Sequence, residues 1–244
     1  MTSTRTPQNP VFVALDVDSG DKAMKLARDL RPHVGGFKIG LELFTSEGAR
    51  IVEEVGAHDV FLDLKFHDIP NTVRGASRAA AKMGVKIFNV HCLGGLEMMR
   101  AAREAIDDVS NATSSTRSQV IGVTILTSHD RASLARLGLD EEPQVTVRRL
   151  ALLAREAGLD GVVCSPHEIE VVRKECGGDF LIVTPGVRPA DAELGDQKRV
   201  MTPREALDAG ATWLVVGRPI TAAKNPVEAA ANIARELGQT DLKH

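Results

Sequence analysis

The chain has 244 residues, of which 43% are hydrophobic and 26% are charged. This composition is typical of a globular protein and excludes an intrinsically disordered chain. The 30 Lys and Arg nearly balance the 33 Asp and Glu, and no long run of either sign occurs, so neither a nucleic-acid partner nor an anionic membrane is indicated. No apolar run approaches the roughly 18 residues of a membrane helix, and the polar N-terminus does not resemble a secretory signal. We therefore expect a soluble, cytoplasmic protein without a membrane partner.

Short runs rich in Val, Ile, Leu and Phe alternate along the chain with longer segments of helical composition. The predicted strands are 11–15, 36–39, 60–64, 85–90, 120–126, 161–164, 180–184 and 212–216. Helical periodicity is clear over 72–83 and 146–157, and a glycine follows each segment directly. The polar segment 108–118 is predicted to be a surface loop, and 186–201 is a long segment without an apolar period, which is usually functional or disordered.

Eight apolar strands separated by helices predict an α/β fold, a single-domain (β/α)8 TIM barrel with parallel strands. We expect the barrel to occupy residues 11–238, with a flexible N-terminal tail at 1–10 and a C-terminal tail at 239–244. The competing architecture is a doubly wound open sheet, which usually binds nucleotides through a Gly-rich turn after its first strand. The sequence Leu15-Asp16-Val17-Asp18-Ser19 at that position carries neither GxGxxG nor GxxxxGK[ST], which favours the barrel.

Charged residues occur at the C-terminal ends of the first three predicted strands, where barrel enzymes carry their catalytic groups. Asp16 ends the first strand, Lys38 lies in the second, and Asp63 and Lys65 share one face of the third. If that face is the barrel interior, Asp63 and Lys65 must be paired, and Lys38 is a natural further partner. An ordinary salt bridge on a half-exposed strand explains the Asp63–Lys65 pair equally well. Taken alone, Asp16 could cap the helix that begins near Ser19, and Lys38 could be a surface lysine.

Glycine-rich turns after the last two strands of a barrel often bind a phosphate group. Gly186 and Arg188 follow the seventh predicted strand, and Gly217 and Arg218 follow the eighth. Glycine permits a close approach of the backbone, and the guanidinium group matches phosphate geometry. Plain turns with solvent-facing arginines are the alternative, but the coincidence of both signals at the expected strands favours a phosphate site.

The segment from 61 to 73 carries a longer motif, Phe61-Leu62-Asp63-Leu64-Lys65-Phe66-His67-Asp68-Ile69-Pro70-Asn71-Thr72-Val73. This motif closely resembles the signature of orotidine 5'-phosphate decarboxylases. Similarity extends to Leu15-Asp16, Phe37-Lys38-Ile39-Gly40, Leu126-Thr127-Ser128, Thr184-Pro185-Gly186-Val187-Arg188-Pro189, Asp196-Gln197 and Val216-Gly217-Arg218-Pro219-Ile220. The resemblance spans 11–237 and implies a cofactor-free, metal-free barrel enzyme. Such an enzyme converts orotidine 5'-monophosphate to UMP and CO2, the last step of de novo pyrimidine nucleotide synthesis.

The resemblance also implies residue roles and a homodimer with shared active sites. Lys38, Asp63 and Lys65 would form a charged network completed by Asp68 of the partner subunit, with Lys65 as the proton donor. Asp16, Lys38 and the partner's Asp68 and Thr72 would hold the ribose hydroxyls, and Ile69 would be a further substrate contact. Thr127 and Gln197 would contact the pyrimidine or close over it. The phosphate would be bound by Arg188, Gly217 and Arg218. Neither His67 nor His91 is assigned a metal.

The chemistry of this reaction suits a charged network. Loss of CO2 leaves an electron pair at C6 in the ring plane, so conjugation cannot delocalise it and preorganised cations must stabilise it. Lys65 would supply the charge and then a proton, while Asp63 beside the departing carboxylate would add ground-state repulsion.

Two other functions remain open from the sequence. A metal-dependent sugar-phosphate decarboxylase or aldolase of the same superfamily would share the DxKxxD strand, and a non-catalytic nucleotide-binding barrel would share the fold. The pyrimidine-side residues argue against the first, and the complete set of charged positions argues against the second.

Overall fold

The computed structural model describes residues 9–113, 116–189 and 201–238. Eight parallel strands close into a barrel in sequence order, and the first strand pairs with the last, so the predicted fold class is confirmed. The strands are β1 (Val11–Ala14), β2 (Gly36–Gly40), β3 (Val60–Phe66), β4 (Ile87–His91), β5 (Gln119–Val123), β6 (Gly161–Val163), β7 (Leu181–Pro185) and β8 (Trp213–Val216).

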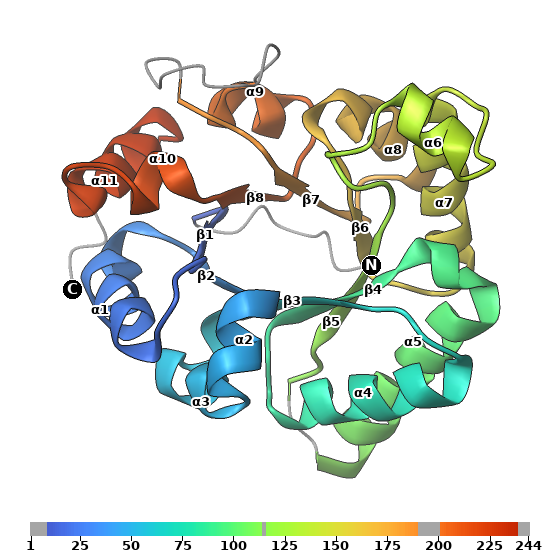
Figure 1. Cartoon of the computed structure of the whole chain (residues 1–244), viewed down its shortest axis with the longest axis horizontal. Helices are drawn as coiled ribbons and strands as arrows, with labels where there is room; N and C mark the ends of the chain where they lie inside the picture. The colour runs from blue at the N-terminus through green and yellow to red at the C-terminus, as the bar shows by residue number, and fades with distance from the viewer. Residues whose placement is uncertain (1–8, 114–115, 190–200, 239–244) are drawn as a thin grey trace.

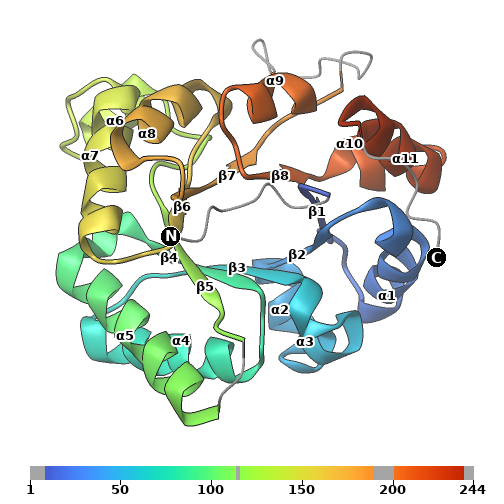
Figure 2. The same cartoon turned by 180° about the vertical axis from the view of Figure 1, so that it is seen from behind.

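Helices surround the strands as an outer ring, which both views of the molecule display (Figures 1 and 2). Their bounds are α1 (Gly20–Leu30), α2 (Leu41–Glu47), α3 (Arg50–Val55), α4 (Pro70–Lys82), α5 (Gly95–Thr113), α6 (Arg131–Arg136), α7 (Pro143–Glu156), α8 (Ile169–Cys176), α9 (Pro203–Asp208), α10 (Arg218–Thr221) and α11 (Pro226–Glu236). Single 3-10 turns cover Arg31–His33, Ala57–Asp59, Cys92–Gly94 and Pro166–Glu168. Among these described helices none is long and apolar enough to cross a membrane.

The two helices with the clearest periodicity, α4 and α7, confirm the predictions for 72–83 and 146–157. Both begin a few residues earlier than predicted, because a proline occupies the first helical position, where its missing N–H has no helical partner to lose. Gly84 and Gly158 follow them with φ of 76° and 79°, a left-handed conformation that glycine adopts without a Cβ clash.

Apolar side chains fill the barrel interior up to the level at which the active-site charges begin. The inward-facing cluster consists of Phe12, Ala14, Phe61, Ile87, Ile121, Leu181, Val183, Trp213 and Val215. A larger cluster packs the outer face of the strands against the helices. The filled interior closes the barrel from below, so a ligand can enter only from the C-terminal ends of the strands.

The predicted loop at 108–118 is wrong for residues 108–113, which form the last turns of α5. Ile106 and Val109 are buried and continue the apolar stripe of this helix, while the hydroxyl of Thr113 donates to the carbonyl of Val109 at 2.9 Å. Packing of the stripe outweighs the weak helix propensity of the Ser, Asn and Thr residues, on which the prediction of a loop rests.

Parts of the predicted tails and of the long loop fall outside the described residues, namely 1–8, 239–244 and 190–200. Asn9 and Pro10 are buried, and the Asn9 amide donates to the carbonyl of His33 at 2.8 Å and accepts from the N–H of Val11 at 3.1 Å. The last two residues of the predicted N-terminal tail, Asn9 and Pro10, are therefore packed against the barrel. Cys92, Cys164 and Cys176 are free thiols.

Candidate active site

Four of the predicted charged residues form one chain of alternating sign at the C-terminal end of the barrel. The ammonium Nζ of Lys38 lies 2.9 Å from Oδ1 of Asp16 and 3.5 Å from Oδ2 of Asp63. The Nζ of Lys65 lies 2.7 Å from Oδ1 of Asp63. Neighbouring strands supply these groups, because Lys38 is on β2 and Asp63 and Lys65 are on β3.

The central pair of this network is largely withdrawn from water. Side-chain exposure is 10% for Lys38 and 14% for Asp63, whereas Lys65 is 30% exposed. Burial acts to raise the pKa of Asp63, but the charges of Lys38 and Lys65 outweigh it and hold the pKa below the usual range. Asp63 is therefore ionised at neutral pH. The network is a buried arrangement, which excludes the simpler explanation of a half-exposed surface salt bridge.

Asp16 belongs to the network rather than to a helix cap. Ser19 occupies the N-cap position of α1, and the Asp16 side chain is paired with Lys38 while 61% of it stays exposed. Asp16 is thus the member of the network most open to a ligand.

Strand β3 is irregular at the catalytic residues. Leu62 lies opposite Phe88 of β4 and Phe66 lies opposite Val90, so Asp63 to Lys65 together face the single residue Asn89. Lys65 has a φ of 51°, and within the described residues it is the only non-glycine with positive φ. Alternation along the strand predicts that Asp63 and Lys65 meet, but it does not predict the bulge in the backbone between them.

Asn89 is a site residue that the sequence reasoning missed. Its side chain is buried, donates from Nδ2 to Oδ1 of Asp63 at 2.7 Å, and accepts the backbone N–H of Lys65 on Oδ1 at 2.7 Å. One signal could have found it. Asn89 is the only amide in the otherwise apolar run from Ile87 to Val90, two residues from the inward-facing Ile87.

Two adjoining cavities open above the network. One, of about 270 Å³, is lined by Lys38, Asp63 and Lys65 and by the mainly apolar residues Phe61, Val123, Ile125, Leu126, Thr127, Ser128, Val163, Cys164, Pro185 and Val215. The other, of about 240 Å³, is lined by Ala14, Asp16, Lys38, Pro185, Gly186, Val187, Arg188, Val215, Gly217, Arg218 and Pro219. Lys38 belongs to both walls, so a single ligand can extend from an apolar chamber to a cationic one.

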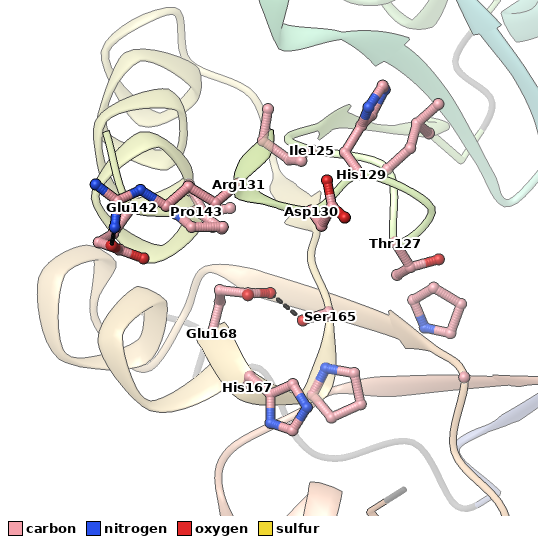
Figure 3. A pocket seen from close by; sticks show the side chains of 15 residues that line it. Ile125, Thr127, His129, Asp130, Arg131, Glu142, Pro143, Ser165, His167 and Glu168 are labelled. Carbon is pink, nitrogen blue, oxygen red and sulfur yellow. Dashed lines mark hydrogen bonds and ion pairs between the residues drawn. The ribbon is translucent and has the colours of Figure 1, made fainter. Parts of the chain in front are cut away.

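A wider hollow of about 540 Å³ lies beside the apolar chamber, and Thr127 borders both (Figure 3). The hydroxyl of Ser165 donates to the carboxylate of the buried Glu168 in its wall, and Arg131 pairs with Glu142 at 2.6 Å. These charged groups are already paired within the protein, and the network of β2 and β3 does not extend into this hollow.

Two histidines adjoin Lys65 without joining the network. The rings of His67 and His91 stack with centroids 5.3 Å apart, and Nδ1 of His91 accepts the N–H of Leu93 at 3.3 Å. Burial, with the nearby charges of His67 and Lys65, lowers the pKa of His91 to about 4. His91 is therefore neutral at physiological pH. Across the described parts of the chain, no group of three or more His, Cys, Asp or Glu side chains is arranged to hold a metal ion.

Three predicted site residues lie apart from the network in the single chain. Asp68, Ile69 and Thr72 are exposed at the start of α4, and the carboxylate of Asp68 accepts the N–H of Ile69 at 2.6 Å. Among residues 9–113, 116–189 and 201–238, no cationic group is paired with Asp68. Gln197 lies outside the described residues.

Comparison with known proteins gives the family. A sequence model of the family described as "Orotidine 5'-phosphate decarboxylase / HUMPS family" matches residues 9–233. The chain belongs to this family. Members named orotidine 5'-phosphate decarboxylase include one from Moorella thermoacetica, 53% identical over 94% of this chain and 92% of the relative, and one from Pseudomonas aeruginosa, 52% identical over 95% and 98%.

Solved structures agree with this membership. Orotidine 5'-phosphate decarboxylase from Lactobacillus acidophilus superposes with a TM-score of 0.81 at 37% identity, covering 93% of this chain and 98% of that one. An uncharacterized conserved protein from Geobacillus kaustophilus superposes with a TM-score of 0.77 at 39% identity, covering 93% and 99%. The range matched by the family includes the whole charged network and both cavities.

Proposed function

We propose that the protein decarboxylates orotidine 5'-monophosphate to UMP and CO2, using the charged network as its catalytic apparatus. The observation that carries this proposal is the alternating chain of Asp16, Lys38, Asp63 and Lys65 at the junction of an apolar and a cationic chamber. Membership of the family and 52–53% identity to relatives that bear this name support it.

The network can stabilise the electron pair that decarboxylation leaves at C6. That pair lies in the plane of the pyrimidine, so a fixed cation close to C6 is the available source of stabilisation. Lys65 lines the apolar chamber, where low polarity strengthens its field, and it can then pass a proton to C6. Asp63, ionised beside it, would face the substrate carboxylate and favour its departure. The residues of the chain supply every charge that this step requires, so the proposal includes no cofactor.

The two chambers suit the two ends of a nucleotide. The apolar chamber would take the pyrimidine, with Thr127 at its edge and Gln197 as a further contact. Arg188, Gly217 and Arg218 line the cationic chamber, where guanidinium and backbone N–H groups can bind the phosphate. Asp16 lines the cationic chamber and Lys38 lines both chambers, so these two residues would contact the ribose that joins the two ends.

We also propose that two copies of the chain share their active sites. Ile69 is 67% exposed, and Leu41 and Leu93 are 57% and 44% exposed, although each follows the C-terminal end of one of the neighbouring strands β2, β3 and β4. Exposed apolar residues next to a catalytic mouth favour an isologous contact with a second copy. Asp68 and Thr72 of the partner subunit would then reach the ribose and complete the network around Lys65.

The remaining parts of the proposal concern organisation and surroundings. Residues 11–238 would act as one catalytic domain, with tails on either side. The net charge of −3 and the biosynthetic role of the reaction favour a cytoplasmic enzyme that has neither nucleic acid nor membrane as a partner.

A direct assay tests the function. The purified protein is mixed with orotidine 5'-monophosphate, and the loss of the substrate's ultraviolet absorbance is followed with and without excess EDTA. We expect the same rate of UMP formation in both. Loss of activity with the chelator would instead favour the metal-dependent sugar-phosphate reaction, and binding without turnover would favour a non-catalytic barrel.

A further inference from the structure

Asn89 connects the two charged residues of β3 from the neighbouring strand. Its amide oxygen accepts the backbone N–H of Lys65, and its amide nitrogen donates to the carboxylate of Asp63, both at 2.7 Å. We propose that Asn89 is a positioning residue of the decarboxylation, which sets the backbone of Lys65 and the carboxylate of Asp63 relative to each other. The inference rests on the proposed function.

The irregular backbone of β3 explains why this support is needed. At a φ of 51° Lys65 is in a conformation that costs a non-glycine residue about 1 kcal/mol or more, so neighbouring groups must hold it there. The bulge removes Lys65 from the regular pairing with β4, and Asn89 is the one residue of β4 opposite it. The Asn89 side chain therefore replaces the ladder hydrogen bond that the bulge gives up.

The amide also fixes the carboxylate of Asp63. Oδ1 of Asp63 accepts from both Asn89 and Lys65, which leaves Oδ2 directed to Lys38 at 3.5 Å. The two ends of an amide differ, so only one orientation of the Asn89 side chain satisfies the N–H of Lys65 and the carboxylate of Asp63 together. A carboxylate or an apolar group at position 89 cannot do both.

Asn89 acts through its neighbours and does not itself line either chamber. Its buried side chain contacts the catalytic pair from the strand side, away from the ligand. Its loss should therefore disturb the reacting geometry more than substrate binding. A displacement of about 1 Å at a reacting group can lower a rate by about 100-fold.

The test compares Asn89→Ala and Asn89→Asp with Thr124→Val as a matched control. Thr124 is also fully buried directly after β5, and its hydroxyl donates to the carbonyl of Val163 at 2.8 Å, but it lines neither chamber. For each protein, kcat and KM for orotidine 5'-monophosphate, the Kd of UMP and the melting temperature are measured. We expect both Asn89 variants to lose about 10- to 100-fold in kcat. KM and the Kd of UMP should change far less, and Thr124→Val should keep the wild-type kcat.

Asn89→Asp preserves the size of the side chain and one hydrogen bond, so it decides the question by the same criteria if Asn89→Ala does not fold. A wild-type kcat in a folded Asn89 variant, a loss confined to KM, or an equal loss in Thr124→Val would overturn the positioning role. Failure of the wild-type protein to turn over orotidine 5'-monophosphate would overturn the proposed function and, with it, this inference, which distinguishes the two cases.

Discussion

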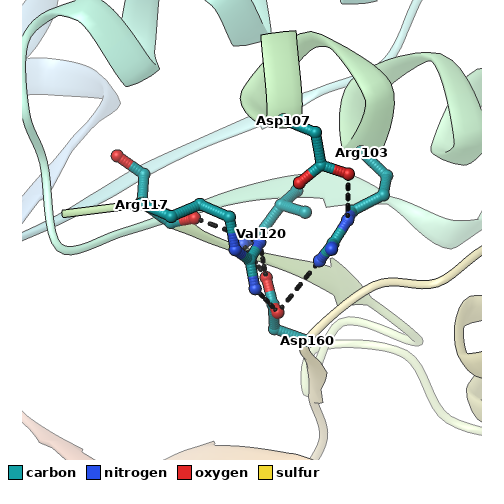
Figure 4. Close-up of polar contacts among 6 residues, drawn as sticks. Arg103, Asp107, Arg117, Val120 and Asp160 are labelled. Atoms are coloured by element: carbon teal, nitrogen blue, oxygen red, sulfur yellow. Dashed lines mark hydrogen bonds and ion pairs between the residues drawn. The ribbon is translucent and has the colours of Figure 1, made fainter. Parts of the chain in front are cut away.

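Two buried carboxylates, Asp63 and Asp160, occupy opposite ends of the same barrel. Their side chains are 14% and 13% exposed, and each has two cationic partners. Asp63 lies at the C-terminal ends of the strands, whereas Asp160 directly precedes β6 at the N-terminal ends (Figure 4). Burial and ion pairing alone therefore do not distinguish them, but Asp63 lines the apolar chamber, whereas Asp160 lines none of the three cavities described above.

In the cluster around Asp160, two arginines and a backbone N–H bind the carboxylate oxygens within the protein. Arg117 pairs with both carboxylate oxygens, Arg103 donates to Oδ1 at 3.2 Å, and the N–H of Val120 donates to Oδ2 at 2.8 Å (Figure 4). Arg103 also binds Asp107 on its own helix. These contacts join α5 to the entries of β5 and β6, and planar guanidinium groups hold them in fixed geometry.

The cluster around Asp63 is built from lysines instead. Lys38 and Lys65 each direct an ammonium group with three donors into a chamber, so donors remain for a ligand after the pairing with Asp63. The difference shows what marks a catalytic ion cluster. The hydrogen-bond donors that remain available at a cavity, and not the depth of burial, distinguish a catalytic ion cluster from a structural one. Three predictions test this contrast, from the largest expected effect to the smallest, and a fourth concerns the histidine beside Lys65.

Lys65→Ala should abolish measurable decarboxylation, with kcat reduced by at least about 10,000-fold, because one ammonium group both stabilises the carbanion and donates the proton. Stopped-flow or extended ultraviolet assays measure the residual rate, and circular dichroism checks the fold. A folded Lys65→Ala protein with substantial turnover would remove Lys65 from the mechanism.

Mixing two inactive variants should restore activity if Asp68 of the partner subunit completes the cluster around Asp63. In a Lys65→Ala and Asp68→Ala mixed dimer, the site built on the Asp68→Ala chain has its own Lys65 and receives Asp68 of the partner subunit. Random reassortment makes about half the dimers mixed, so activity should reach roughly a quarter of wild type. Subunit exchange is verified separately by mass spectrometry of differently tagged chains. No recovery after verified exchange would show that Asp68 serves its own subunit.

Asp160→Ala should lower the free energy of unfolding by about 2 kcal/mol, because it leaves partly buried arginines and the N–H of Val120 without their acceptor. The kcat of the folded protein should stay at the wild-type value. Urea denaturation measures the stability change. Asp107→Ala, which removes only a more exposed partner of Arg103, should cost less than about 1 kcal/mol. A large loss of kcat in Asp160→Ala would contradict a purely structural role for the cluster at the N-terminal ends of the strands.

The fourth prediction concerns the pH dependence of stability. His91 has a pKa of about 4 in the folded protein against 6.5 ordinarily, so the unfolded chain takes up the proton first as the pH falls. The burial of neutral His91 is therefore fully compatible with the folded state above pH 6.5, and the free energy of unfolding falls progressively as the pH is lowered towards 4. The urea midpoint of wild type should therefore fall more steeply over this interval than that of His91→Gln. Parallel midpoints would show that His91 is not held neutral by the fold.

Much of the molecule follows from local patterns in the sequence. The eight strands are recovered because their apolar runs are continuous, and their order in the barrel follows from the βα alternation. Asp16, Lys38, Asp63 and Lys65 are found because charges at the ends of apolar strands are conspicuous. The boundaries are displaced by up to three residues, as at the predicted strand 120–126, which ends at Val123. The end of α5 is missed because tertiary packing outweighs the preference of polar residues for loops.

The arrangement within the site is less accessible from the sequence. Asn89 contacts Asp63 and Lys65 from the neighbouring strand. These contacts depend on a bulge in the pairing of β3 with β4, which no local sequence pattern predicts. Asp68, Ile69 and Thr72 are exposed in one chain, and the role proposed for them requires a second copy that neither composition nor periodicity specifies. Only the family resemblance suggested it.

The bulge in β3 also bears on attempts to transplant this chemistry. An idealised barrel with even strand pairing would keep Asp63 and Lys65 on one face, but it would lose the bulge, the φ of 51° at Lys65 and the hydrogen bond from the Lys65 N–H to Asn89. A designer who copies only the Asp-x-Lys letters into such a scaffold would obtain the residues without their geometry. A designed decarboxylase should therefore include both the irregular strand β3 and the neighbouring strand β4 with the amide of Asn89.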